Sequence, residues 1–495
     1  MKTLRSLLNS IGINDISVPD TQLVTSICQH SQKCTPESVF FAFQGMRTDG
    51  SLYIHHAIEN GAVCIIGEKS MLRPHLPPTV RYYSIEHPHT AFALMCAAFY
   101  DHPQKQLKVI GVSGTDGKST TSDYLYQILC RQGVKSGLLT TVTMDDGSGK
   151  KDSPFRQSTP EADELQAFLF RCTENGVTHV VLECTSHGLS KTFDRLAGID
   201  FCAAIITKVT SEHLEFHHSI EEYTNAKVNL VRALQDDGIL ITSTDNPKIS
   251  AFTDVLKSSQ RAIILGADIP MRIEFMGYQG VVVEILGKRV HTPLLLPSLA
   301  TNALLAVFTA STLLNIPAHT MLPSIEQLEP VKGRMQLIEN SLGVRVIIDF
   351  AHTVDAYEGL FFFAKRTSEG GDIIAVFGSA GERDTTKRSR MGKIASRYCA
   401  TIILTEEDPR YEGNQAIFSD LRFLMHNPAA TILEIENRRE AIRKAVSLAQ
   451  NGDTLLFLGK GHEKTIERES QKVPWDEITE VRNALRKEEE RRQCK

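Results

Sequence analysis

Short apolar runs alternate with amphipathic stretches along most of the chain. From residue 107 onward, such runs predict buried strands at 109–112, 137–141, 179–182, 203–207, 238–241 and 262–265. Helical patterns fill the intervals between them. Strands and helices that alternate at this spacing indicate a parallel sheet with helices on both faces, and ligands bind such sheets at the carboxyl ends of the strands.

Similar patterns lie on either side of this block. Short apolar runs at 38–43 and 62–66 come before it, and a second series of strands is expected after it at 344–349, 373–377, 401–404 and 454–458. We therefore predict an α/β protein of three domains. These are a small N-terminal α/β domain (1–104), a central parallel-sheet domain with a phosphate-binding loop (105–329) and a C-terminal Rossmann-like α/β domain (330–495).

A glycine-rich turn follows the first strand of the central block and leads into a helical pattern. Its glycines let backbone N–H groups face phosphate oxygens, Lys118 can reach the outer phosphates and Ser119 can ligate Mg²⁺. The common phosphate-loop pattern has a glycine where Val112 stands, so the spacing is unusual. A plain turn would need only one glycine. We predict an ATP site at Gly114, Thr115, Asp116, Gly117, Lys118, Ser119 and Thr120.

Composition excludes several classes of function. The 495 residues are 42% hydrophobic and 23% charged, with a net charge of -5, so neither nucleic acid nor an anionic membrane is an expected partner. No apolar run reaches membrane-spanning length and the N-terminus lacks a signal-peptide pattern, so we expect a cytoplasmic protein without membrane insertion. The ten cysteines form no Cys-x-x-Cys pair and are expected to be free thiols.

Three further side chains follow the central strands. Glu183 ends the strand at 178–183, where its carboxylate can hold magnesium. His213 follows the strand at 203–207, although a lone histidine is more often a hydrogen-bonded residue of the fold. Lys227 lies one helical turn from Tyr223, which by itself predicts a surface pair.

The order of several motifs resembles a known family, the Mur ligases, and among them the UDP-N-acetylmuramoyl-tripeptide synthetases. The resemblance extends from about residue 31 to 485. It is carried by Gly114-Thr-Asp-Gly-Lys-Ser-Thr120, Glu183-Cys-Thr-Ser-His-Gly-Leu189, Glu212-His-Leu-Glu-Phe-His217, Tyr223-Thr-Asn-Ala-Lys227, Gly333-Arg-Met335, Asp349-Phe-Ala-His-Thr353 and Gly459-Lys-Gly-His-Glu463.

The resemblance implies an ATP-dependent amide ligase of peptidoglycan precursor synthesis. Such an enzyme adds an amino acid to UDP-N-acetylmuramoyl-L-alanyl-D-glutamate through an acyl phosphate, and its N-terminal domain binds the uridine nucleotide. The resemblance implies catalytic roles for Lys118, Glu183, His213 and Lys227. It also implies two Mg²⁺ ions held by Ser119, Glu183, His213 and Lys227, with Lys227 carbamylated by CO₂.

The remaining site residues are assigned by the same resemblance. The C-terminal domain is expected to close over ATP with Arg334, Asp349 and His352, and Asn302 is expected near the base. The peptide nucleotide would contact Ser31, Ser158, Thr159, Ser186 and Arg195. The incoming amino acid would contact Arg388, Asp408, Arg410, Gly459 and Glu463. A cation and an anion together suit a diamino acid, and we expect the enzyme to act as a monomer.

Departures from the family pattern leave the amino acid open. Glu407-Asp-Pro-Arg410 stands where diaminopimelate enzymes have Asp-Asn-Pro-Arg. Arg410 suits the second carboxylate of meso-diaminopimelate, which we favour slightly, while Asp408 suits the ammonium of lysine or ornithine. His30, Gln32 and Lys208 also differ from the family pattern, so the peptide-nucleotide pocket is less well defined.

Two rival functions remain at this point. The first is another ligase of the superfamily, such as a folylpolyglutamate-type enzyme, but Ser31 and Thr48-Asp-Gly50 resemble the uridine-binding domain and argue against it. The second is a noncatalytic nucleotide-binding or regulatory protein that kept the fold. Intact Lys118, Glu183, His213 and Lys227 argue against that alternative.

Overall fold

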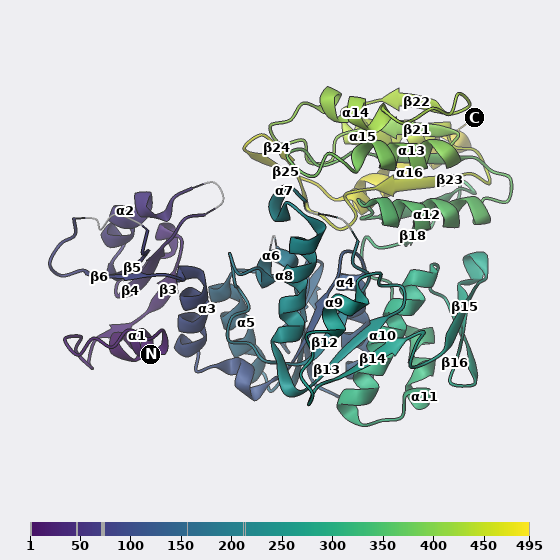
Figure 1. The fold of residues 1–495 in the computed structure, drawn as a ribbon. Helices are drawn as coiled ribbons and strands as arrows, with labels where there is room; N and C mark the ends of the chain where they lie inside the picture. Colours follow the sequence, from purple (N-terminus) through teal and green to yellow (C-terminus); the bar gives the residue numbers. More distant parts are fainter. Residues whose placement is uncertain are drawn as a thin grey trace.

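The computed structural model describes residues 2–45, 48–70, 75–155, 157–210, 212 and 214–494. Three α/β units follow one another along the chain, and the last lies above the central one in the view of Figure 1. The predicted fold class is confirmed. Short 3-10 helices occur at Ser31–Lys33, Gly50–Tyr53, Pro103–Gln106, Gly277–Gln279 and Leu322–Gln327.

The N-terminal unit is a parallel sheet of order β3-β4-β5-β6. Val39 and Phe41 of β4 pack into one hydrophobic cluster, whereas Phe40 and Ala42 pack into another, so alternate side chains fill the two faces. The strands are β1 (Lys2–Thr3), β2 (Leu23–Val24), β3 (Ser26–Cys28), β4 (Ser38–Ala42), β5 (Ala62–Glu68) and β6 (Arg81–Ile85). The helices are α1 (Leu4–Ser10), α2 (Ile54–Glu59) and α3 (Pro88–Phe99).

The central sheet has the order β10-β9-β8-β11-β7-β12-β13-β14. Its parallel strands are β7 (Lys108–Ser113), β8 (Ser136–Leu139), β11 (His179–Glu183), β12 (Phe201–Ile206), β13 (Leu234–Ser243) and β14 (Arg261–Leu265). The antiparallel edge strands are β9 (Thr143–Asp145) and β10 (Lys151–Asp152). A separate antiparallel sheet contains β15 (Met271–Phe275), β16 (Val281–Ile285) and β17 (Lys288–Thr292), which the apolar pattern did not predict.

Helices cover both faces of the central sheet, as predicted. Ile110 and Val112 of β7 pack with α4 and α10, while Val109 packs with α5 and α8 on the opposite face. The helices of the central unit are α4 (Lys118–Arg131), α5 (Ala162–Glu174), α6 (Ser186–Leu189), α7 (Leu214–His217), α8 (Ile220–Arg232), α9 (Ile249–Thr253), α10 (Pro297–Leu314) and α11 (Ala318–Met321).

Helix α10 is the one helix in the described part of the chain that is long and apolar enough to cross a membrane. Ala303, Leu304 and Val307 of α10 are nevertheless fully buried, and the helix packs closely against α4. Its apolar character is explained by this central position, since a helix that is covered on most sides carries few polar residues.

The C-terminal sheet has the order β18-β19-β23-β20-β21-β22, with β18 antiparallel. The strands are β18 (Gln336–Ile338), β19 (Arg345–Asp349), β20 (Ile373–Phe377), β21 (Thr401–Leu404), β22 (Thr431–Glu434), β23 (Thr454–Leu458) and the hairpin β24 (Thr465–Arg468) and β25 (Gln471–Pro474). Helices α12 (Val354–Thr367), α13 (Arg388–Tyr398) and α14 (Asn414–Arg422) pack on one face, and α15 (Arg438–Leu448) and α16 (Glu477–Gln493) on the other. The carboxyl ends of these strands carry the motifs at 349–353, 378–381, 407–410 and 459–463.

Candidate active site

The phosphate loop joins β7 to α4 and depends on two glycines with positive φ. Gly114 has a φ of +148°, and a Cβ there would lie 1.8 Å from Thr207 Oγ1. A Cβ on Gly117, whose φ is +86°, would lie 2.7 Å from Asn302 Nδ2. Only glycine fits both the backbone and the space at these positions. Asn302 of α10 therefore lies directly against the loop.

Lys118 and Ser119 begin helix α4, whose N-terminus carries a partial positive charge. Lys118 Nζ donates to Thr115 O at 2.6 Å, and Thr207 Oγ1 donates to Asp116 O at 2.7 Å, which holds the loop against β12. Thr120 is buried in the first turn of the helix. The loop thus presents a cation and a helix N-terminus at one place, as an anionic phosphate requires.

The pairing of strands in the central sheet places Glu183 beside the phosphate loop. Strand β11 pairs with β7, with Glu183 opposite Val112. Ser119 Oγ donates to Glu183 Oε2 at 2.8 Å, and Thr141 N donates to the same oxygen at 3.2 Å. A hydroxyl and a carboxylate side by side are oxygen ligands of the kind that Mg²⁺ prefers. The described residues contain no larger cluster of His, Cys, Asp or Glu that could hold a metal ion.

Lys227 of α8 is buried in the same site and is not a surface residue. Its side chain is 1% exposed, and Nζ donates to Gly114 O at 2.7 Å. The ammonium lies 4.3 Å above the ring of Tyr223, whose hydroxyl is 3.1 Å from Thr115 Oγ1. Burial lowers the pKa of Lys227 well below its ordinary value, and the charge of Lys118 lowers it further. The interpretation of Lys227 and Tyr223 as a surface pair is therefore wrong.

His213 lies outside the described residues, but its neighbour Glu212 is a buried site residue that the motif analysis did not assign. Glu212 Oε1 lies 3.0 Å from Lys387 Nζ and 3.3 Å from His352 Nε2. Burial opposes the charge of Lys387, but the Glu212 carboxylate outweighs it and raises the pKa of Lys387. The available signal was a carboxylate in the loop after β12, which is weaker than the position of Glu183 at the very end of its strand.

The C-terminal domain brings its predicted nucleotide residues to the phosphate loop. Thr353 Oγ1 donates to Asp116 Oδ2 at 2.8 Å across the domain boundary. The Asp349 carboxylate accepts hydrogen bonds from the backbone N–H of Met335 at 2.5 Å and of Ala351 at 2.6 Å. These bonds join the motif at 333–335 to the motif at 349–353. Burial raises the pKa of Asp349.

Arg334 lies in the same group of loops. Its guanidinium lies 4.5 Å above the ring of Phe350. The Nε of Arg334 is buried without a hydrogen-bond partner among the described residues. A buried donor without a partner is costly, so this side chain suits a ligand that accepts a hydrogen bond.

The residues predicted to bind the peptide nucleotide lie in two places. Thr159 Oγ1 donates to Glu183 O at 2.9 Å. Arg195 donates from Nη1 to Thr159 O at 3.0 Å and pairs through Nη2 with Glu161. Ser158 is partly buried, and Ser186 is buried at the start of α6. Ser31 is buried in the N-terminal domain, with its Oγ 2.8 Å from His56 Nδ1.

The predicted amino-acid residues follow the strands β20, β21 and β23 along the chain. Arg388 has no exposed surface and binds the carboxylates of Glu412 and Asp420. Gly459 has a φ of +97°, and a Cβ there would meet Glu407. The other predicted amino-acid residues are Asp408, Arg410 and Glu463. The structure adds Lys460 to the site, because its buried ammonium contacts both Asp408 and Glu463.

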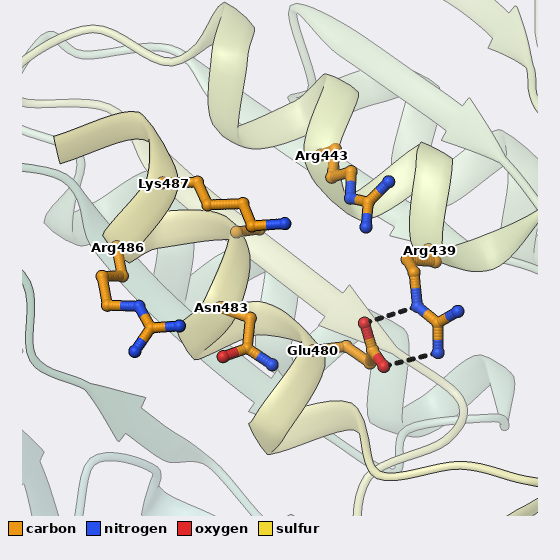
Figure 2. Close-up of a pocket in the computed structure, with 7 residues that line it drawn as sticks. Arg439, Arg443, Glu480, Asn483, Arg486 and Lys487 are labelled. Carbon is orange, nitrogen blue, oxygen red and sulfur yellow. Dashed lines mark hydrogen bonds and ion pairs between the residues drawn. The ribbon is translucent and has the colours of Figure 1, made fainter. Parts of the chain in front are cut away.

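A cavity lies between α15 and α16 (Figure 2), and none of the predicted site residues lines it. Glu480 binds the guanidinium of Arg439 there, with two contacts of 2.7 Å. The other charged side chains around it are basic: Arg443, Arg486 and Lys487.

Comparisons with known proteins agree with this geometry. Residues 23–100 match the family model "Mur ligase family, catalytic domain", residues 112–310 match "Mur ligase middle domain" and residues 333–461 match "Mur ligase, glutamate ligase domain". A UDP-N-acetylmuramyl-tripeptide synthetase of Borreliella afzelii (strain PKo) is 38% identical, with 93% of each chain covered.

Two further matches, one relative and one solved structure, carry names that state the amino acid. A protein of Caldanaerobacter subterraneus subsp. tengcongensis, named UDP-N-acetylmuramoyl-L-alanyl-D-glutamate--2,6-diaminopimelate ligase, is 32% identical over 94% of this chain and 95% of its own. A solved structure with the same name superposes with a TM-score of 0.64 at 24% identity, covering 99% of this chain and 100% of the other.

The phosphate loop, the carboxylate and lysine beside it and the covering C-terminal domain define an ATP-dependent ligase. The chain belongs to the Mur ligase family. The match includes the N-terminal region and nearly the whole length of the relatives, so the family resemblance predicted from the motifs is confirmed.

Proposed function

We propose that the protein adds a diamino acid to UDP-N-acetylmuramoyl-L-alanyl-D-glutamate, with ATP as the energy source, in the synthesis of peptidoglycan precursors in the cytoplasm. The convergence of Lys118, Glu183 and the buried Lys227 on one phosphate loop carries this proposal. The hydrogen bond from Thr159 to the Glu183 carbonyl supports it, because it ties the expected muramoyl-peptide segment to the edge of the ATP site. The names of the relatives support the choice of substrate.

The reaction has two steps. A carboxylate oxygen of the D-glutamate residue attacks the γ-phosphorus of ATP, and ADP leaves. The amine of the amino acid then attacks the acyl carbon, phosphate leaves and the nitrogen loses a proton. Both partners of the first step are anions, so the Lys118 ammonium and the N-terminus of α4 lower the barrier by neutralising charge that gathers on the phosphoryl oxygens.

Lys227 has the properties that carbamylation requires. Only a neutral amine attacks CO₂, and burial lowers the pKa of Lys227 so that its neutral form is favoured. The carbamate formed on Lys227 carries a negative charge, which the neighbouring Lys118 ammonium attracts. The ammonium form of Lys227 is instead repelled by Lys118. We propose Ser119, Glu183, His213 and the Lys227 carbamate as holders of two Mg²⁺ ions, which when bound would offset the charge of the phosphates.

Release of phosphate tests the whole proposal. The protein is supplied with ATP, Mg²⁺, bicarbonate and UDP-N-acetylmuramoyl-dipeptide, and each of lysine, ornithine and diaminopimelate is added in turn. We expect phosphate release that depends on both the peptide nucleotide and an amino acid. Absence of release with every amino acid would favour a noncatalytic nucleotide-binding role. Release with a folate substrate and glutamate in place of these would favour the folylpolyglutamate-type reaction.

A further inference from the structure

The loop that carries Asp408 and Arg410 is fastened to strand β24. Arg410 N donates to Glu467 O at 3.0 Å, and Glu469 N donates to Arg410 O at 2.8 Å. Glu467 N in turn donates to Asp408 Oδ1 at 2.9 Å. These bonds fix Asp408, Arg410 and Glu467 relative to one another, so the charges of their side chains act as one group.

The guanidinium of Arg410 already has partners within the protein. Its Nε donates to Glu467 Oε2 at 3.1 Å and its Nη1 donates to Gly381 O at 2.5 Å, while Nη2 lies 4.0 Å from Asp408 Oδ2. The side chain of Arg410 is only 11% exposed. A pair this well shielded from water keeps most of its attraction, so the positive charge of Arg410 is largely neutralised by Glu467.

Lys460, a second cation of the site, is neutralised in the same way. Lys460 is fully buried, with Nζ 2.8 Å from Asp408 Oδ1 and also in contact with Glu463. Glu463 retains a side-chain exposure of 33%, and Glu407 lies beside Gly459. The carboxylates of Glu407, Asp408, Glu463 and Glu467 therefore outnumber the cations Arg410 and Lys460. The third cation, Arg388, is already paired with Glu412 and Asp420. Each carboxylate can accept several hydrogen bonds, so Asp408 and Glu463 can bind a further ammonium.

Resting on the proposed function, we propose that the incoming amino acid carries a distal ammonium and no second carboxylate, as lysine and ornithine do, and that Glu467 determines this specificity. A distal ammonium meets the excess of carboxylates favourably. A second carboxylate would require Arg410 to leave Glu467, and it would be repelled by Asp408 and Glu463. This charge balance reverses the slight preference for diaminopimelate that the Arg410 motif suggested.

The first test compares amino acids with the unaltered enzyme. We expect kcat/KM for lysine or ornithine to exceed that for meso-diaminopimelate by about 100-fold or more, since an unpaired buried charge strongly disfavours the wrong substrate. A value for diaminopimelate equal to or above both others would overturn the inference while leaving the ligase function intact. If no amino acid releases phosphate, the proposed function itself fails.

The second test changes the charge balance. Glu467→Gln releases the charge of Arg410, so we expect kcat/KM to rise about 10-fold for diaminopimelate and to fall for lysine or ornithine, mainly through KM. Glu469→Gln on the same hairpin is the control, because Glu469 is exposed, and both values should stay unchanged. Opposite changes for two substrates cannot come from damage to the fold. Equal losses for both would count against the role of Glu467.

Discussion

The Lys387 ammonium lies 3.0 Å from the Glu212 carboxylate and joins the C-terminal domain to the central domain. Both side chains are largely buried, at 12% and 5% exposure, so water screens their attraction weakly. Thr353 binds Asp116 of the phosphate loop nearby, and Lys208 pairs with Asp355. These contacts join the two domains beside the phosphate loop.

Replacing Glu212 should open this arrangement in a pH-dependent way. His352 also contacts Glu212, and although burial opposes its charge, the Glu212 carboxylate raises the pKa of His352. Protonated His352 therefore favours closure below its ordinary pKa, and this contribution is lost as pH rises through the raised value, while Lys387 stays charged. We expect Glu212→Gln to increase the radius of gyration in small-angle scattering, and more at about pH 6 than at about pH 9.

Two control variants test whether the pH-dependent opening comes from the contacts of Glu212 with Lys387 and His352. Glu221→Gln, on the exposed face of α8, should leave the scattering unchanged. His352→Gln should remove most of the pH dependence but not the contact with Lys387. An unchanged radius in Glu212→Gln at both pH values would show that this carboxylate does not hold the domains together.

Removal of the Lys227 side chain should abolish activity and allow chemical rescue. We expect Lys227→Ala to reduce phosphate release to background and added formate or acetate to restore part of it, because a small carboxylate can occupy the place of the carbamate. Lys288→Ala, at an exposed position of β17, should behave like the wild type in both conditions. Full activity of Lys227→Ala without added carboxylate would refute the carbamate role.

The two glycines Gly114 and Gly133 offer a matched pair of substitutions. Both have positive φ, but a Cβ on Gly114 would clash with Thr207 whereas nothing lies within 4 Å of one on Gly133. We expect Gly114→Ala to abolish ATP binding measured by calorimetry. Gly133→Ala should cost about 1 kcal/mol of stability through backbone strain alone and should bind ATP normally. Normal binding by Gly114→Ala would mean that the loop can move away from Thr207.

Adjacent arginines of α15 should differ widely in their effect on stability. Arg438 and Glu477 form an ion pair in which neither side chain is exposed, and Arg438 also donates to Leu458 O. Arg438→Ala leaves the buried Glu477 carboxylate without its cation, although Trp475 Nε1 still donates to it at 2.7 Å. The substitution should lower the free energy of unfolding of the C-terminal domain by about 3–5 kcal/mol. Arg439 pairs with Glu480 at the surface (Figure 2), so Arg439→Ala should cost at most about 1 kcal/mol. Denaturant unfolding monitored at Trp475 measures the loss of unfolding free energy in both variants. Similar losses would contradict the conclusion that the buried ion pair contributes more than the exposed one.

Much of the fold could be predicted because its strands have local signals. The buried runs at 109–112 and 373–377 contain almost only apolar residues, and they form the strands β7 and β20. The strands β15–β17 were not predicted, since they lie in an antiparallel sheet outside the alternation of strands and helices. The alternation of apolar and charged residues along Met271–Phe275 was the sequence signal that could have found the first of them.

The sequence by itself determined the α/β class, the phosphate loop and the family, because each of these depends on residues that are close together in the chain. Only the tertiary structure decided which charged side chains are buried and which partners they pair with. Lys227 is buried against Gly114, Arg388 is enclosed by Glu412 and Asp420, and Arg410 is paired with Glu467. These partners come from separate elements, and the strength of an ion pair depends on distance and burial, which only the assembled fold provides.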